Sequence, residues 1–91
     1  MLKIRRSEDA GFTVFVLSGR IEEADVSDLQ GLLDAEATPL TVAVDLGEVR
    51  LVDREAVRFL ALAKGQGIEL RNCPAYIREW IDKGSDKRHE Q

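Results

Sequence analysis

The chain has 91 residues, the length of one small domain. With 44% hydrophobic and 33% charged residues, its composition is that of an ordinary globular protein, and this excludes a disordered or membrane-embedded chain. The formal net charge is −4, and no apolar run is long enough to span a membrane. Because no basic-then-apolar leader opens the chain, we expect a cytoplasmic protein that does not insert into membranes. The single cysteine, Cys73, cannot form an internal disulfide, which agrees with a reducing compartment.

The acidic residues are concentrated in residues 20–37. There Arg20 is the single base among six acids, namely Glu22, Glu23, Asp25, Asp28, Asp34 and Glu36. Such a surface repels phosphate backbones, and no basic stripe with interleaved aromatic residues occurs elsewhere. We therefore expect no nucleic-acid partner, and a solvated helix face explains the charge.

The first third of the chain predicts a hairpin followed by a helix. Alternating apolar and basic residues indicate an edge strand over residues 2–6, and a polar turn ending at Gly11 leads to a second strand over residues 12–18. The chain then leaves the sheet at Gly19 and enters a helix capped by Asp25. The apolar face of this helix consists of Val26, Leu29, Leu32 and Leu33.

Two features interrupt or end this helix. Gly31 lies inside it, where we expect either close backbone packing or local weakness. Thr38 and Pro39 break the helix and lead the chain to the next strand.

The centre of the chain is its most apolar part and organises the rest. Residues 42–46 predict a short buried strand that ends at Gly47, and the loop over residues 47–52 returns Val49, Leu51 and Val52 to the core. Asp53 precedes a helical pattern and is expected to be its N-cap. Gly65 is expected to end this helix in the left-handed conformation.

The last third predicts a strand over residues 68–71 and a final helix that opens at Pro74. Two strand-helix-strand crossovers imply parallel pairing in the second half of the chain. The apolar stripe of the final helix is Tyr76, Ile77, Trp80 and Ile81. Residues 1–83 are thus expected to form one α/β domain of order ββαβαβα, with a small mixed four-stranded sheet and helices packed on it, and residues 84–91 a disordered tail.

The order and spacing of these elements resemble STAS domains, the family of bacterial anti-sigma factor antagonists and of sulfate-transporter cytoplasmic tails. The resemblance covers about residues 2–83. It rests on the Leu-Ser-Gly-x-Ile exit from the second strand (residues 17–21), on Asp45 and Leu46, on Val52 and Asp53, and on the last helix opened by a proline. Family members usually continue with a fifth strand and a further helix, so this chain resembles a trimmed version whose strand over residues 68–71 has an open side.

In the antagonist branch of the family, the resemblance implies a switch serine directly after the aspartate, which a partner kinase phosphorylates. This chain has Arg54 at that position and Glu55 at the position of a second serine, so no phosphorylation site is expected there. Three interpretations stay open. Glu55 imitates a permanent phosphate, Arg54 and Glu55 are ordinary surface charges at a helix start, or Arg54, Glu55 and Arg58 form a charged contact patch for a partner protein.

The side chains that could carry enzyme chemistry form no convincing set. His89 lies in the expected tail, and Cys73 precedes Pro74 at a helix start with no histidine near it in the sequence. Asp45 and Asp53 lie at the carboxyl end of the central strand, where parallel sheets collect ligands, but their capping roles require no catalysis. We expect no enzyme, no metal and no cofactor.

The first functional hypothesis is a non-enzymatic module that binds an anti-sigma factor or a kinase-like regulator through Asp53, Arg54, Glu55 and Arg58. A second hypothesis is a soluble STAS accessory subunit of a membrane transporter complex. A small nucleotide- or ligand-binding protein ranks third. A homodimer is also expected from the shortened sheet and from Tyr76 and Trp80, which indicate a core or dimer contact.

Overall fold

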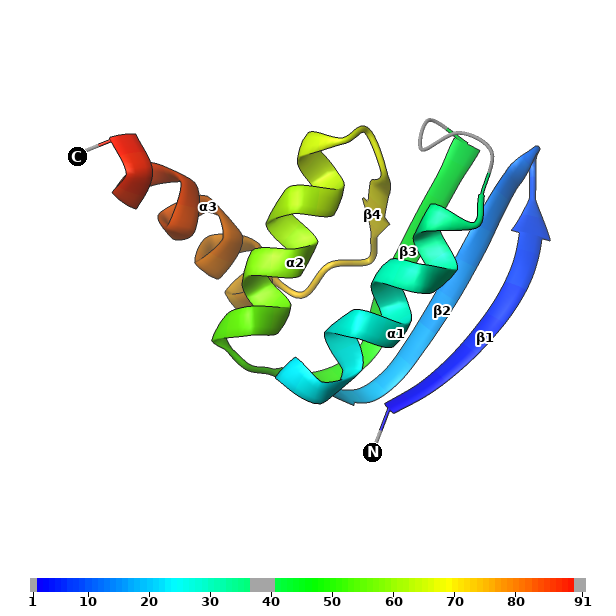
Figure 1. Ribbon diagram of the computed structural model, residues 1–91, viewed down its shortest axis with the longest axis horizontal. Helices are drawn as coiled ribbons and strands as arrows, with labels where there is room; N and C mark the ends of the chain where they lie inside the picture. The colour runs from blue at the N-terminus through cyan, green and yellow to red at the C-terminus, as the bar shows by residue number, and fades with distance from the viewer. Residues whose placement is uncertain (1, 37–40, 90–91) are drawn as a thin grey trace.

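The computed structural model describes residues 2–36 and 41–89. Its elements are β1 (Leu2–Asp9), β2 (Phe12–Ile21), α1 (Glu23–Asp34), β3 (Val42–Val52), α2 (Arg54–Gly65), β4 (Glu69–Arg71) and α3 (Ala75–His89). The strands form one sheet of order β1-β2-β3-β4, in which β1 is antiparallel to β2 while β2, β3 and β4 run parallel (Figure 1). The predicted ββαβαβα order and the mixed four-stranded sheet are confirmed.

The β1–β2 hairpin is longer than predicted. β1 continues to Asp9, and the turn consists of Ala10 and Gly11, whose φ angles are 52° and 86°. Two left-handed residues suit the twist of a hairpin. Because an exposed edge strand needs no apolar residues, the alternation of apolar and polar residues did not predict the polar second half of β1. β2 does not leave the sheet at Gly19, because a register shift there lets it continue to Ile21.

β3 includes the segment over residues 47–52 that the sequence predicts as a loop. Two register shifts against β2 give β3 extra residues, so the simple alternation of side chains fails there. Val49 and Val52 are buried in the core as predicted, whereas Leu51 is 55% exposed, and its predicted return to the core is wrong.

The helices lie on one face of the sheet. Figure 1 shows α1 drawn across β3, and α2 between α3 and β4. Buried residues of α1, α2 and α3 form one core with Leu17, Val44 and Leu46 of the sheet. Val14 and Ala43 are also buried, but they lie outside this cluster, on the opposite face of the sheet.

Several helix ends differ from the prediction. Asp25 is the third residue of α1 and not its N-cap, since its carboxylate accepts a hydrogen bond from the backbone nitrogen of Glu22 at 2.9 Å. Gly67, with a φ of 101°, takes the left-handed conformation after α2 in place of Gly65, which is still helical. α3 begins directly after Pro74.

α3 also continues to His89, so residues 84–89 are helical where the sequence predicts a disordered tail. The prediction relied on the missing apolar periodicity, and the propensities of Gly84, Ser85 and Asp86 do not favour a helix either. Residues 90–91, the rest of that tail, and the predicted break at Thr38 and Pro39 lie outside the described residues. No helix in the described part of the chain is both long and apolar enough to cross a bilayer.

Candidate functional site

Asp53 connects the first turns of two helices. Its Oδ1 atom accepts a hydrogen bond from the backbone nitrogen of Ala56 at 2.9 Å, which confirms the predicted N-cap of α2. Its Oδ2 atom accepts a second one from the backbone nitrogen of Glu23 at 2.7 Å, in the first turn of α1. Both oxygens of this half-buried carboxylate therefore satisfy helix N–H groups of the chain itself. The second bond depends on how α1 and α2 are placed, so the local sequence carries no signal for it.

The charged residues that follow Asp53 point outward. Arg54 and Arg58 are exposed and lie one helical turn apart on α2, with the half-exposed Glu55 between them. Glu55 forms an ion pair with Arg58 at 3.5 Å, whereas Arg54 makes no hydrogen bond or ion pair within residues 2–36 and 41–89. Arg54, Glu55 and Arg58 thus lie together in the first turns of α2, while the carboxylate of Asp53 binds backbone groups of α1 and α2.

Exposed apolar side chains also occur on β3 and α3, which precede and follow α2 in the chain. Leu51 is 55% exposed, and Tyr76 of α3 is 48% exposed and donates its hydroxyl to the backbone carbonyl of Arg50, next to Leu51. Trp80, one turn after Tyr76, is also 48% exposed. Tyr76 and Trp80 are thus not core residues, because Ile77 and Ile81 fill the buried side of α3. We call Leu51, Arg54, Arg58 and Tyr76 the α2 surface.

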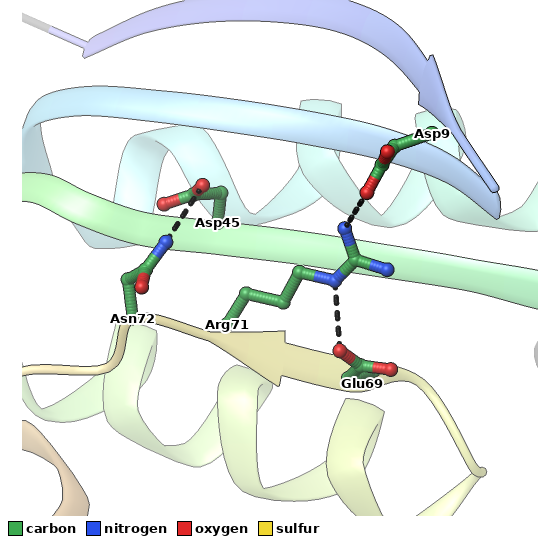
Figure 2. Close-up of polar contacts among 5 residues, drawn as sticks. All are labelled: Asp9, Asp45, Glu69, Arg71 and Asn72. Carbon is green, nitrogen blue, oxygen red and sulfur yellow. Dashed lines mark hydrogen bonds and ion pairs between the residues drawn. The ribbon is translucent and has the colours of Figure 1, made fainter.

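Asp45 lies on another part of the molecule. It is in the middle of β3 and not at its carboxyl end, because β3 continues to Val52. Its two oxygens accept hydrogen bonds from the backbone nitrogen of Gly47 at 2.9 Å and from the side-chain nitrogen of Asn72 at 3.0 Å (Figure 2). Asp45 and Asp53 therefore hold different segments, and they form no carboxylate pair.

Arg71 joins both edges of the sheet. Figure 2 shows its side chain reaching from β4 across β3 toward Asp9. The guanidinium donates to Glu69 at 2.7 Å and to Asp9 at 2.9 Å, and it lies 5.0 Å from the centre of the Phe12 ring. The hydrogen bonds to Glu69 and Asp9 raise the pKa of Arg71. The sequence gives no signal for this cluster, since its members come from opposite ends of the chain.

Two further residues with reactive side chains lie near the two ends of α3. Cys73 is half-buried, and desolvation raises the pKa of its thiol, which favours the protonated form. His89 is the last residue of α3. Among the described residues, no three His, Cys, Asp or Glu side chains are grouped to hold a metal ion.

A broad hollow of about 420 Å³ lies near β1 and β2. It is lined by Lys3, Ile4, Arg5, Val16, Ser18 and Glu48. The hydroxyl of Ser18 donates to the carboxylate of Glu48 at 3.1 Å, so two of the polar groups in this hollow bind each other.

Neither a family model nor a curated protein sequence matches the chain. Solved structures do. An anti-sigma factor antagonist from Mycobacterium paratuberculosis aligns with a TM-score of 0.71 and 20% identity, over 97% of this chain and 82% of that one. An antisigma-factor antagonist STAS domain from Rhodobacter sphaeroides aligns with a TM-score of 0.55 and 16% identity, over 78% and 86%.

This chain has the STAS fold. The resemblance in element order is therefore confirmed at the level of the fold. A third structure, described as Mglu, aligns with a TM-score of 0.63 and 18% identity over 78% of this chain, which spans only 19% of that protein. The STAS fold thus also aligns with a small part of a much longer chain.

Proposed function

We propose that this protein is a non-enzymatic, cytoplasmic interaction module that docks a bacterial regulatory protein on its α2 surface. The observation that carries the proposal is that Arg54 and Arg58 of α2 are exposed together with two large apolar side chains of the neighbouring elements, Leu51 and Tyr76. Protein interfaces favour arginine and aromatic residues at their centre. Asp53 is a positioning residue in this proposal, because it holds the first turn of α2 in place.

The proposed partner is an anti-sigma factor or a kinase-like regulator with acidic residues at its contact. Two structures with the same fold are described as anti-sigma factor antagonists. Arg54 stands where the family resemblance implies a phosphorylatable serine, so the docking we propose does not depend on phosphorylation. An arginine in the first helical turn presents positive charge where a phosphoserine would present negative charge.

Affinity capture from native bacterial lysate, with quantitative mass spectrometry, tests the proposal. The wild-type protein is compared with the double variant Arg54→Ala, Arg58→Ala. The matched control is Lys64→Ala, Arg78→Ala, which removes the same charge from exposed positions on α2 and α3. Wild type and control are expected to retain one regulatory protein. The amount that the Arg54 and Arg58 variant recovers is expected to be at least tenfold lower, which corresponds to about 1.4 kcal/mol of binding free energy.

Other outcomes contradict the proposal. Equal recovery by all three proteins would remove the α2 surface as the docking site. Recovery of a membrane transporter complex instead of a regulator would favour the accessory-subunit hypothesis. A nucleotide or metabolite that raises the melting temperature would favour a ligand-binding protein, since a ligand of the native state stabilises it.

A further inference from the structure

β1 is the outer strand of the sheet, and no described strand pairs with its free side. Its residues 3–9 are all exposed. Asp9 and Phe12 flank the two-residue turn, and their backbone N–H and C=O groups point toward each other. Along β1, the backbone groups of successive residues then point alternately toward β2 and toward the free edge. Glu8, Arg6 and Ile4 therefore direct their backbone N–H and C=O groups at the free edge, where they form a template for another strand.

The side chains of β1 follow the same alternation between the two faces of the sheet. Arg6 pairs with Phe15 and lies on the helix side, and Glu8 lies on this side as well. Arg5 and Asp9 lie on the opposite face. Within each face, β1 thus has a positive residue before Ser7 and a negative residue after it.

This sign change makes β1 complementary to itself. When two copies pair antiparallel with Ser7 opposite Ser7, Arg6 lies opposite Glu8 and Arg5 lies opposite Asp9, twice over. Centring the pairing on Arg5, Arg6 or Glu8 places like charges opposite each other at the axis, and directly opposed like charges destabilise a sheet. If the twofold axis lay between two residues of β1, each side chain would stand opposite one that points to the other face of the joined sheet. Such registers therefore do not fit a regular antiparallel pair.

We propose that two copies of this chain join through β1, antiparallel around a twofold axis at Ser7, to form a continuous eight-stranded sheet. The charges are available for this contact. The side chains of Glu8 and Asp9 are 74% and 68% exposed, and within residues 2–36 and 41–89 the ion pairs of Arg6 are those at 3.8 Å to Glu8 and 3.7 Å to Glu36. Asp9 contacts Arg71 through Oδ2, which leaves Oδ1 for the partner's Arg5.

Sedimentation velocity over a concentration series tests this pairing through its charges. The wild-type protein is expected to shift from the mass of one chain to twice that mass, and less so at high salt. Arg6→Glu and Glu8→Arg each place like charges opposite each other in a homodimer, so each variant alone is expected to stay monomeric. An equimolar mixture of the two variants restores opposite charges and is expected to dimerise, as is the chain that carries both substitutions.

A cysteine at the axis tests the register directly. In a Cys73→Ser background, Ser7→Cys is expected to form a disulfide-linked dimer under mild oxidation, because the two residues lie directly opposite each other. Lys3→Cys, on the same exposed strand, is expected to stay monomeric. A wild-type chain that remains monomeric at all concentrations would overturn the proposal, and so would equal cross-linking at both positions or a mixture that fails to dimerise.

Discussion

Asp53 stabilises the fold by binding the first turns of α1 and α2 with one carboxylate. Replacing an N-cap by alanine costs about 0.5–2 kcal/mol, and losing the second hydrogen bond, to the exposed backbone nitrogen of Glu23, adds about 0.5–1.5 kcal/mol. We therefore expect Asp53→Ala to lower the free energy of unfolding by about 1–3 kcal/mol. Urea denaturation measures this loss.

The matched control for Asp53 is Asp28→Ala, on the exposed side of α1. It also removes one carboxylate, which makes no hydrogen bond in the part of the chain that the structure describes, so its effect should stay within about 0.5 kcal/mol. Equal effects of the two substitutions would show that the double capping by Asp53 contributes nothing to stability.

Cys73 is expected to be an unreactive thiol. Burial raises its pKa above the ordinary value of 9.0, so less thiolate is present in the folded protein than in the unfolded chain at neutral pH. The stability that this shift contributes is complete below the unfolded pKa and is lost as the pH rises through the folded pKa. A thiol-reactive reagent should label the native protein more slowly than the urea-unfolded protein at pH 7 to 8, and equal rates would contradict the assignment.

Among the helices, α1 contains a residue that lowers its stability. Gly31 is exposed in the middle of the helix, and a Cβ atom added there meets nothing within 4 Å. Close packing is thus excluded, and the predicted local weakness is the remaining explanation. Gly31→Ala is expected to raise the free energy of unfolding by about 1 kcal/mol, because alanine loses less backbone entropy on folding.

At Gly67, replacement by alanine is expected to change the free energy of unfolding in the opposite direction. Its φ of 101° is strained for any residue with a Cβ atom, so Gly67→Ala should destabilise the protein. If both substitutions changed stability in the same direction, the distinction between a helical and a left-handed glycine would fail here.

The element order could be predicted from the sequence because apolar periodicity and local caps specify it. The N-cap at Asp53 and the buried Val49 and Val52 are examples. The predictions were wrong where nonlocal pairing decides the structure, as in the polar half of β1 and the register shifts that expose Leu51. At the candidate site, the sequence placed Arg54 and Glu55 correctly at a helix start, but contacts between distant segments, such as that of Tyr76 with Arg50, leave no local pattern.

At the scale of the whole molecule, the two proposed contacts use different ends of the sheet. β1 lies at one end and α3 lies beyond α2 at the other (Figure 1). Pairing through β1 would therefore leave Arg54, Arg58 and Tyr76 free on both copies. A dimer would present two docking surfaces, and a partner with two contact sites would gain from their effective concentration.

Site-specific photo-crosslinking tests whether a partner docks through the first turn of α2. A photoreactive amino acid replaces Glu55, which lies in that turn and leaves Arg54 and Arg58 in place, in one protein and Lys64, at the other end of the same helix, in a second. Position 55 is expected to cross-link a single regulatory protein in native lysate, and position 64 is not. Cross-linking from position 64 alone, or from neither position while the wild-type protein still captures a partner, would contradict docking through this turn.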